Sequence, residues 1–164
     1  MSTDTSERYT EWHPVSWEQL HKDSKTLARR LLDKGPFERI VAVTRGGLVP
    51  AAIIARELDI RLVDTLCISS YDWRSQGEGC TVLKGVEGTG KGCLVIDDLV
   101  DTGGTAKVVR SLLPDAYFAT VYAKPEGLVM VDEHIIAVEQ HVWVLFPWDS
   151  APQYVHPIAS PERR

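Results

Sequence analysis

The most informative part of the sequence is residues 95–105, which read Val-Ile-Asp-Asp-Leu-Val-Asp-Thr-Gly-Gly-Thr. The apolar residues from Cys93 to Ile96 are typical of a strand that is buried on both faces, and two carboxylates follow at its end. Gly103 and Gly104 then allow a tight loop, after which residues 105–113 have a helical pattern. Backbone N–H groups at the start of a helix, reached through such a loop, form a cradle for an anion. The stretch therefore predicts a strand, a phosphate-binding loop and a helix in succession.

The acidic residues beside this cradle indicate a further group between them and the anion. Carboxylates accept hydrogen bonds from sugar hydroxyls and bind hard cations such as Mg²⁺. Neighbouring residues on a strand face opposite ways, so we favour Asp98 over Asp97 as a metal ligand. Asp101 opens the run Asp-Thr-Gly-Gly-Thr, which favours a reactive role over the alternative of a helix cap.

The flanking sequence alternates between strand and helix patterns. A capping box starts the first helix at Ser16, and a further helix is expected over about 48–58. Such alternation predicts a parallel sheet with ligands bound beyond the carboxyl ends of its strands. Residues 1–13 are expected to form a loose leader, and residues 71–92, which are rich in glycine and polar residues, a flexible loop. Strands are expected over residues 39–43, 61–69, 93–96, 116–123 and 134–138.

Composition excludes several classes of protein. A chain of 164 residues is expected to form one domain, and its net charge of −5 argues against a nucleic-acid partner. The three cysteines show no C-x-x-C pair, which disfavours a disulfide framework or a structural zinc site. No apolar run approaches the roughly 20 residues of a membrane span. We therefore expect a cytoplasmic protein.

The run over residues 95–105 resembles the phosphoribosyl-diphosphate motif of the type I phosphoribosyltransferases. The resemblance extends from about Val15 to Asp149 and implies a single α/β domain over residues 1–164. Its fold would be a central, mostly parallel sheet flanked by helices, with a small C-terminal hood over about 134–155. The other matching segments are Thr44-Arg45-Gly46-Gly47 (diphosphate loop), Ser69-Ser70-Tyr71-Asp72 (start of the flexible active-site loop), Ala123-Lys124-Pro125 (purine-reading lysine) and Trp143-Val144 with Pro147-Trp148-Asp149 (hood).

The resemblance implies an Mg²⁺-dependent purine salvage enzyme. It would transfer the phosphoribosyl group of 5-phospho-α-D-ribose 1-diphosphate (PRPP) to xanthine or guanine, and more weakly to hypoxanthine, forming XMP or GMP and diphosphate. Asp101 would be the catalytic base, Asp98 would bind metal with Asp149 as a second candidate, and the Thr44–Arg45 peptide would be cis. The implied PRPP and diphosphate residues are Arg45, Gly46, Asp97, Asp98, Leu99, Val100, Asp101, Thr102, Gly103, Gly104 and Thr105, and the implied purine residues are Asp101, Lys124, Trp143 and Val144. Trp143 would stack on the base, whereas Trp148 would pack.

Other readings stay open beside this one. The family carries an arginine in its flexible loop, whereas Gly77 or Glu78 falls near that position here and Arg74 or Lys84 would have to substitute. A hypoxanthine-guanine enzyme is the main alternative, and a non-catalytic regulator that senses PRPP or nucleotides is another. The resemblance also implies a homo-oligomer, either a dimer or a tetramer, and allows a weak peripheral association with the inner membrane.

Overall fold

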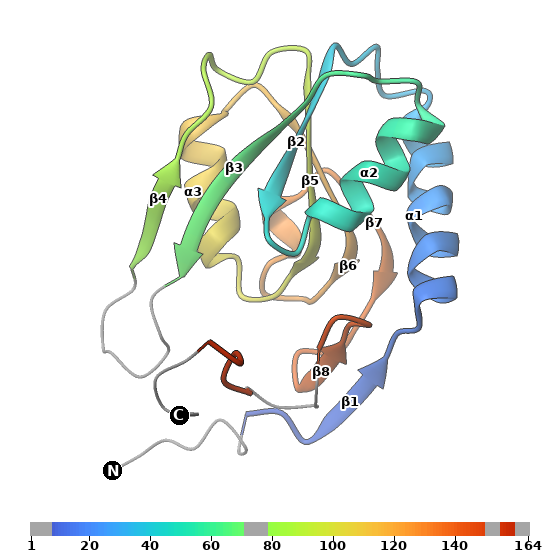
Figure 1. Ribbon diagram of the computed structural model, residues 1–164, viewed down its shortest axis with the longest axis vertical. Helices are drawn as coiled ribbons and strands as arrows, with labels where there is room; N and C mark the ends of the chain where they lie inside the picture. The colour runs from blue at the N-terminus through green and yellow to red at the C-terminus, as the bar shows by residue number, and fades with distance from the viewer. Residues whose placement is uncertain (1–7, 71–78, 150–154, 160–164) are drawn as a thin grey trace.

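A six-stranded sheet forms the centre of the protein (Figure 1). The computed structural model describes residues 8–70, 79–149 and 155–159. Neighbouring strands run parallel except for the antiparallel pair β3 and β4, which confirms the expected mostly parallel sheet. In spatial order the strands are β4 (Cys80–Lys84), β3 (Val63–Ser70), β2 (Arg39–Thr44), β5 (Cys93–Val100), β6 (Tyr117–Ala123) and β7 (Glu133–Ala137).

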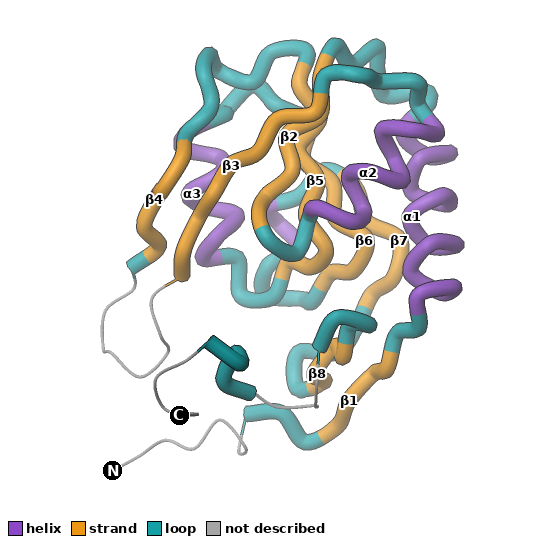
Figure 2. The backbone as a smooth tube through the Cα atoms, viewed as in Figure 1, coloured by secondary structure: helices purple, strands orange, loops and turns teal. Residues whose placement is uncertain are grey.

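Three α-helices cover the two faces of this sheet. Helices α1 (Trp17–Leu31) and α2 (Leu48–Glu57) pack on one face, and α3 (Gly104–Leu112) packs on the other (Figures 1 and 2). The predicted capping box is present, because the Gln19 N–H donates to the Ser16 hydroxyl at 3.1 Å. A short 3₁₀ helix, η2 (Leu128–Met130), follows β6. Two apolar clusters, one on each face of the sheet, bury the central strands.

The hood is a second, two-stranded sheet. Strand β1 (Glu11–Pro14) pairs in parallel with β8 (Val142–Leu145), and Figure 1 shows the pair beside the edge where the large sheet's strands end. This corrects two expected boundaries. The loose leader does not reach residue 13, and the hood does not begin at residue 134, because β7 belongs to the large sheet. Every side chain of β1 is exposed, so the strand forms through backbone pairing with a distant segment and leaves no apolar alternation in the sequence.

Two further boundaries differ from the sequence prediction. Part of the expected loop 71–92 is β4, which pairs with β3, and residues 71–78 lie outside the described residues. Strand β5 continues to Val100, so the two carboxylates lie within it rather than at its end. The ladder to β6 extends as far as the pair Val100 and Ala123 and holds this polar part extended. None of the helices in the described part of the chain is long and apolar enough to cross a membrane.

Candidate active site

A cavity of about 1110 Å³ lies where the central strands end, as the parallel sheet predicted. Its walls come from the ends of β2 and β5, the start of α3, and residues such as Tyr9, Trp148 and Asp149 that lie next to the hood strands in the sequence. All of the predicted PRPP residues meet here, although they come from two segments that are about 50 positions apart in the sequence. The cavity is lined by Arg45, Gly46, the whole run from Asp97 to Thr105, and Asp149.

The predicted phosphate cradle corresponds to the loop between β5 and α3. Gly103 has a φ of +94°, a conformation that L side chains rarely adopt, and it immediately precedes the helix. Gly104 has open space around its Cα on the side where a Cβ would stand. No side chain among the described residues caps this helix, so its first N–H groups are available to an anion together with the hydroxyl of Thr105.

The predicted diphosphate loop lies across the cavity from the cradle. The peptide bond between Thr44 and Arg45 is cis, as the resemblance implied. Arg45 is exposed and lines the cavity. A Cβ on Gly46 would collide with the carboxylate of Asp98, so the backbone of this loop packs directly against the acidic strand. The loop thus brings a cation and backbone groups to the same space as the carboxylates.

The pKa values of the Asp97, Asp98 and Asp149 carboxyl groups are all raised, because each group is partly or fully buried. Burial raises the pKa of Asp98 to about 6, and the charge of Asp149 adds to the effect. Burial and the neighbouring Asp98 raise the pKa of Asp97 well above its ordinary value. One Asp149 oxygen accepts a hydrogen bond from the Phe146 N–H at 2.9 Å, so this residue also stabilises the turn that follows β8. A divalent cation would relieve this repulsion, and the oxygen-only donor set fits Mg²⁺.

A ready-made metal site of several side chains is not found among the described residues. No group of three or more His, Cys, Asp or Glu side chains that could hold a metal occurs within residues 8–70, 79–149 and 155–159. Mg²⁺ typically binds through one or two carboxylates and completes its shell with water and substrate phosphate oxygens. Asp98 and Asp149, which both line the cavity, remain the predicted metal ligands.

Asp101 is held by polar contacts on both of its oxygens. Lys124 is only 1% exposed, and its ammonium donates to Asp101 Oδ2 at 3.0 Å. The side-chain amide of Gln140 donates to Oδ1 at 2.7 Å, while its own oxygen accepts from the Glu126 N–H at 3.0 Å. Sequence reasoning missed Gln140, because nothing in its local sequence places it 2.7 Å from a residue 39 positions away.

Tyr9 is the second residue that sequence reasoning missed. Its hydroxyl donates to Asp101 Oδ2 at 2.8 Å. Its ring lies under the Lys124 ammonium, 4.5 Å from the ring centroid, and meets Trp143 edge-on with centroids 5.1 Å apart. Burial, followed by the hydrogen bond and charge of Asp101, raises the pKa of the Tyr9 hydroxyl far above its usual range. The residue falls within the expected leader, and no local sequence pattern connects that segment with the site.

One of the four predicted purine residues lines the cavity, and the other three do not. Of this set only Asp101 reaches the wall, whereas Lys124, Trp143 and Val144 are not lining residues in the part of the chain that the structure describes. Val144 is buried in the core, and the Trp143 indole N–H has no hydrogen-bond partner among the described residues. Trp148, which was expected to pack, stacks on Phe146 with centroids 4.9 Å apart but also lines the cavity, which Trp143 does not among the described residues.

The remaining expected residues have clear positions. The side chains of Leu99 and Val100 pack into the two apolar clusters, although both residues also border the cavity. Lys84 donates to Asp64 at 2.8 Å and to the Thr65 carbonyl at 2.7 Å, so this cation is engaged within the β3–β4 hairpin. The other loop positions considered, Arg74, Gly77 and Glu78, lie outside the described residues.

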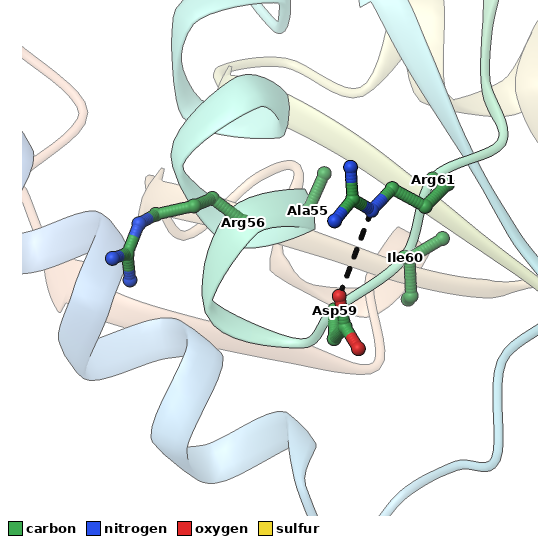
Figure 3. Close-up of a pocket in the computed structure, with 5 residues that line it drawn as sticks. All are labelled: Ala55, Arg56, Asp59, Ile60 and Arg61. Carbon is green, nitrogen blue, oxygen red and sulfur yellow. Dashed lines mark ion pairs between the residues drawn. The ribbon is translucent and has the colours of Figure 1, made fainter.

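A second hollow lies at the C-terminal end of α2 (Figure 3). Figure 3 shows an ion pair between Arg61 and Asp59 across it, with Arg56 pointing away. Both members of the pair are almost fully exposed, so the hollow has neither a buried polar group nor a cluster of reactive side chains. It is not a candidate for the reaction.

Comparison with known families agrees with this site. The phosphoribosyl transferase domain matches residues 16–154, which is most of the chain. This family match agrees with three features of the structure, namely the parallel sheet, the glycine loop after β5 and the acidic pair. The protein therefore belongs to the type I phosphoribosyltransferase family, as an enzyme of the xanthine-guanine phosphoribosyltransferase group.

Individual relatives and solved structures show the same family likeness. The chain is 62% identical over 156 residues to the xanthine-guanine phosphoribosyltransferase of Nitratidesulfovibrio vulgaris, covering 95% of this chain and 96% of that protein. The corresponding protein of Desulfotalea psychrophila is 58% identical, with 97% and 99% covered. The purine phosphoribosyltransferase of Pyrococcus horikoshii has a TM-score of 0.74 at 26% identity, with 88% of this chain and 98% of that one covered. The sheet, helices and hood thus form the fold of this family.

Proposed function

We propose that this protein transfers the phosphoribosyl group of PRPP to xanthine or guanine. The observation that carries the proposal is the Asp101 carboxylate, which lies between the phosphate cradle and the buried ammonium of Lys124. This arrangement places a proton acceptor and a hydrogen-bond donor for a purine next to a site for a sugar phosphate. The high identity to xanthine-guanine phosphoribosyltransferases supports the same activity.

The residues suggest how the groups would be held. The cradle from Gly103 to Thr105 would bind the 5′-phosphate, and Arg45 would neutralise the diphosphate. Asp98 and Asp149 would hold Mg²⁺, which, when bound, reduces the negative charge that develops on the leaving group. The hood and the walls of the cavity would limit access of water to the electron-poor sugar carbon.

In the proposed reaction the bond from C1′ of the ribose to diphosphate breaks and a bond from C1′ to purine N9 forms. The electron pair of the broken bond leaves with diphosphate. The purine loses its N7 proton, and Asp101 is positioned to accept it. General-base assistance of this kind contributes roughly 10²–10⁴-fold to a rate.

Lys124 would select the base. An ammonium only donates hydrogen bonds, so it suits the 6-oxo group of xanthine, guanine or hypoxanthine and has no acceptor to offer the 6-amino group of adenine. Because Lys124 is buried, a mismatched base would leave one of its N–H donors without the acceptor that a 6-oxo group provides, although Asp101 still pairs with the charge. The backbone near Val144 would read the 2-position.

The test is diphosphate release from PRPP and Mg²⁺ with xanthine, guanine, hypoxanthine and adenine in parallel. We expect turnover with xanthine and guanine, weaker turnover with hypoxanthine and none with adenine. Turnover mainly with hypoxanthine would retain the mechanism and move the specificity to the hypoxanthine-guanine alternative. No turnover with any base, in a protein that still binds PRPP, would contradict the proposal and favour a regulator. We also predict that the protein is cytoplasmic and forms a homo-oligomer.

A further inference from the structure

Tyr9 shares its contacts with the group of residues that would bind the base. Its hydroxyl donates to Asp101, its ring face lies 4.5 Å from the Lys124 ammonium, and its edge meets Trp143. Tyr9 itself lines the cavity, whereas Lys124 and Trp143 do not, as far as the described residues define its wall. The tyrosine ring therefore separates the open cavity from two of the residues proposed to recognise the purine.

The contacts of Tyr9 match the chemistry of a bound purine group by group. A purine would present an N–H donor to Asp101, and the tyrosine presents an O–H donor to the same carboxylate. A purine would cover the Lys124 ammonium with an acceptor, and the tyrosine covers it with the electron-rich face of its ring. Both are flat aromatic groups that fit against Trp143.

We propose that Tyr9 occupies the purine subsite in the free enzyme and that an incoming base displaces it. This inference rests on the proposed function, because it takes Asp101 and Lys124 as the residues that bind the base. In the free enzyme the tyrosine covers the buried Lys124 ammonium with its ring and donates a hydrogen bond to the partly exposed Asp101 carboxylate. The base then takes over these contacts and the ring moves into the cavity or to the surface.

The position of Tyr9 in the chain allows this movement. The neighbouring Thr10 N–H donates to the His141 carbonyl at 3.1 Å, and the β1–β8 pairing begins directly after it at Glu11. Tyr9 thus lies just outside the anchored strand. Rotation about its own dihedral angles can move the ring while β1 and the hood stay paired.

Displacement has a kinetic consequence that a fixed wall of the pocket would not have. When the binding-competent state is only a fraction of the free enzyme, the apparent affinity for the base falls by that fraction. Removing the Tyr9 hydroxyl weakens the occupied state and raises the competent fraction. A tyrosine that stayed in place and contacted the base would have the opposite effect, because its removal would weaken base binding.

The test compares Tyr9→Phe and Tyr9→Ala with wild-type enzyme, and Tyr117→Phe serves as the matched control. Tyr117 begins β6 at the other end of the sheet and packs against Phe37, with ring centroids 5.8 Å apart. For Tyr9→Phe we expect the KM for guanine to fall by roughly tenfold or more, from the loss of one hydrogen bond to a charged acceptor, with kcat and the KM for PRPP unchanged. For Tyr9→Ala we expect a fall at least as large.

A measurement independent of turnover follows the side chain itself. Fluorine NMR of protein labelled with 3-fluorotyrosine, assigned by the signal missing from Tyr9→Phe, is recorded with and without GMP. We expect the Tyr9 signal to shift and sharpen on saturation with GMP. Circular dichroism melting confirms that each variant is folded.

The outcomes separate this inference from the proposed function. Two results would overturn the displacement while wild-type turnover still supports the proposed function. One is a guanine KM that is unchanged or higher in Tyr9→Phe, and the other is a Tyr9 fluorine signal that GMP does not shift. A wild type that neither turns over nor binds any purine overturns the proposed function, and this inference with it.

Discussion

The ammonium of Lys124 lies 3.0 Å from Asp101 Oδ2, so the proposed base-selecting cation and the proposed proton acceptor are one ion pair. Lys124 is 1% exposed, whereas the side chain of Asp101 is 29% exposed and borders the cavity. A pair of this kind is stable only when each charge keeps a partner, because an unpaired buried charge is costly. The geometry therefore couples recognition of the base to the group that would take its proton.

Asp101→Asn separates the two roles of this carboxylate. The amide retains the shape and an oxygen acceptor for Lys124, but it cannot take a proton at neutral pH. We expect kcat to fall by roughly 10²–10⁴-fold while the Kd for GMP changes only a few-fold. Steady-state kinetics and calorimetric titration with GMP measure the two quantities. An equal loss in both would mean that Asp101 acts in binding and not as the general base.

Gln140→Leu tests a positioning role. The substitution removes the 2.7 Å hydrogen bond that holds Asp101 Oδ1. A hydrogen bond to a charged acceptor contributes about 1.5–3 kcal/mol, so we expect kcat to fall by roughly tenfold or more, with little change in the KM for PRPP. Glu139→Gln, at the exposed neighbouring position, is the control.

Gln140→Leu in the Asp101→Asn background shows whether Gln140 acts through the Asp101 carboxylate. If Gln140 acts through the carboxylate, adding Gln140→Leu to Asp101→Asn lowers kcat little further. Fully additive losses would show that Gln140 acts elsewhere, for example through the turn that its oxygen holds at the Glu126 N–H.

Gly46→Ala probes the contact between the diphosphate loop and the acidic strand. The new methyl group would collide with the Asp98 carboxylate and push it or the loop aside. A displacement of about 1 Å in a site of this kind can cost on the order of 10²-fold in kcat/KM. We expect a loss of that size for PRPP and a higher Mg²⁺ concentration for half-maximal rate. Gly85→Ala, where a Cβ meets no atom within 4 Å, is the matched control, and an Mg²⁺ titration identical to that of wild type would refute the argument.

Tyr122→Phe tests what holds α1 on the sheet. The buried Tyr122 hydroxyl donates to Asp23 Oδ2 at 2.6 Å, and Asp23 is only 5% exposed. Gln19 supplies a second bond to the same carboxylate at 2.8 Å. Removing one donor leaves a buried acceptor partly unsatisfied, which costs about 1–3 kcal/mol of the free energy of unfolding. Urea unfolding measures the loss, and Tyr117→Phe, which lacks such a buried partner among the described residues, should stay close to wild type.

The sequence predicted the large sheet well because its elements are marked by local patterns. Residues 39–43 are almost all apolar, and the observed strand β2 covers Arg39–Thr44. The helix expected over 48–58 is observed as α2 over Leu48–Glu57. The weakly marked segments were less predictable, since β1 has no buried side chain and β5 continues through two acidic residues. Their extended conformation depends on pairing with another strand.

The phosphate cradle could likewise be predicted from residues that are contiguous in sequence. Gly103 and Gly104 follow the strand directly, and only a glycine readily adopts the φ of +94° found at Gly103. The resemblance also placed Arg45, Asp98 and Asp101 at the same site, and the structure brings all three to one cavity. Whether each plays its expected part is the subject of the predictions above.

The sequence by itself thus predicted the three helices and every strand of the large sheet except β4, together with the glycine loop before α3, because hydrophobic period and glycine geometry act between near neighbours. The tertiary structure alone decided what surrounds Asp101. Tyr9 reaches it across 92 positions and Gln140 across 39, through β1–β8 pairing and the turn before β8. Hydrogen bonds of this kind depend on where separate segments pack in space, and an isolated tyrosine or glutamine has no local pattern that records its distant partner.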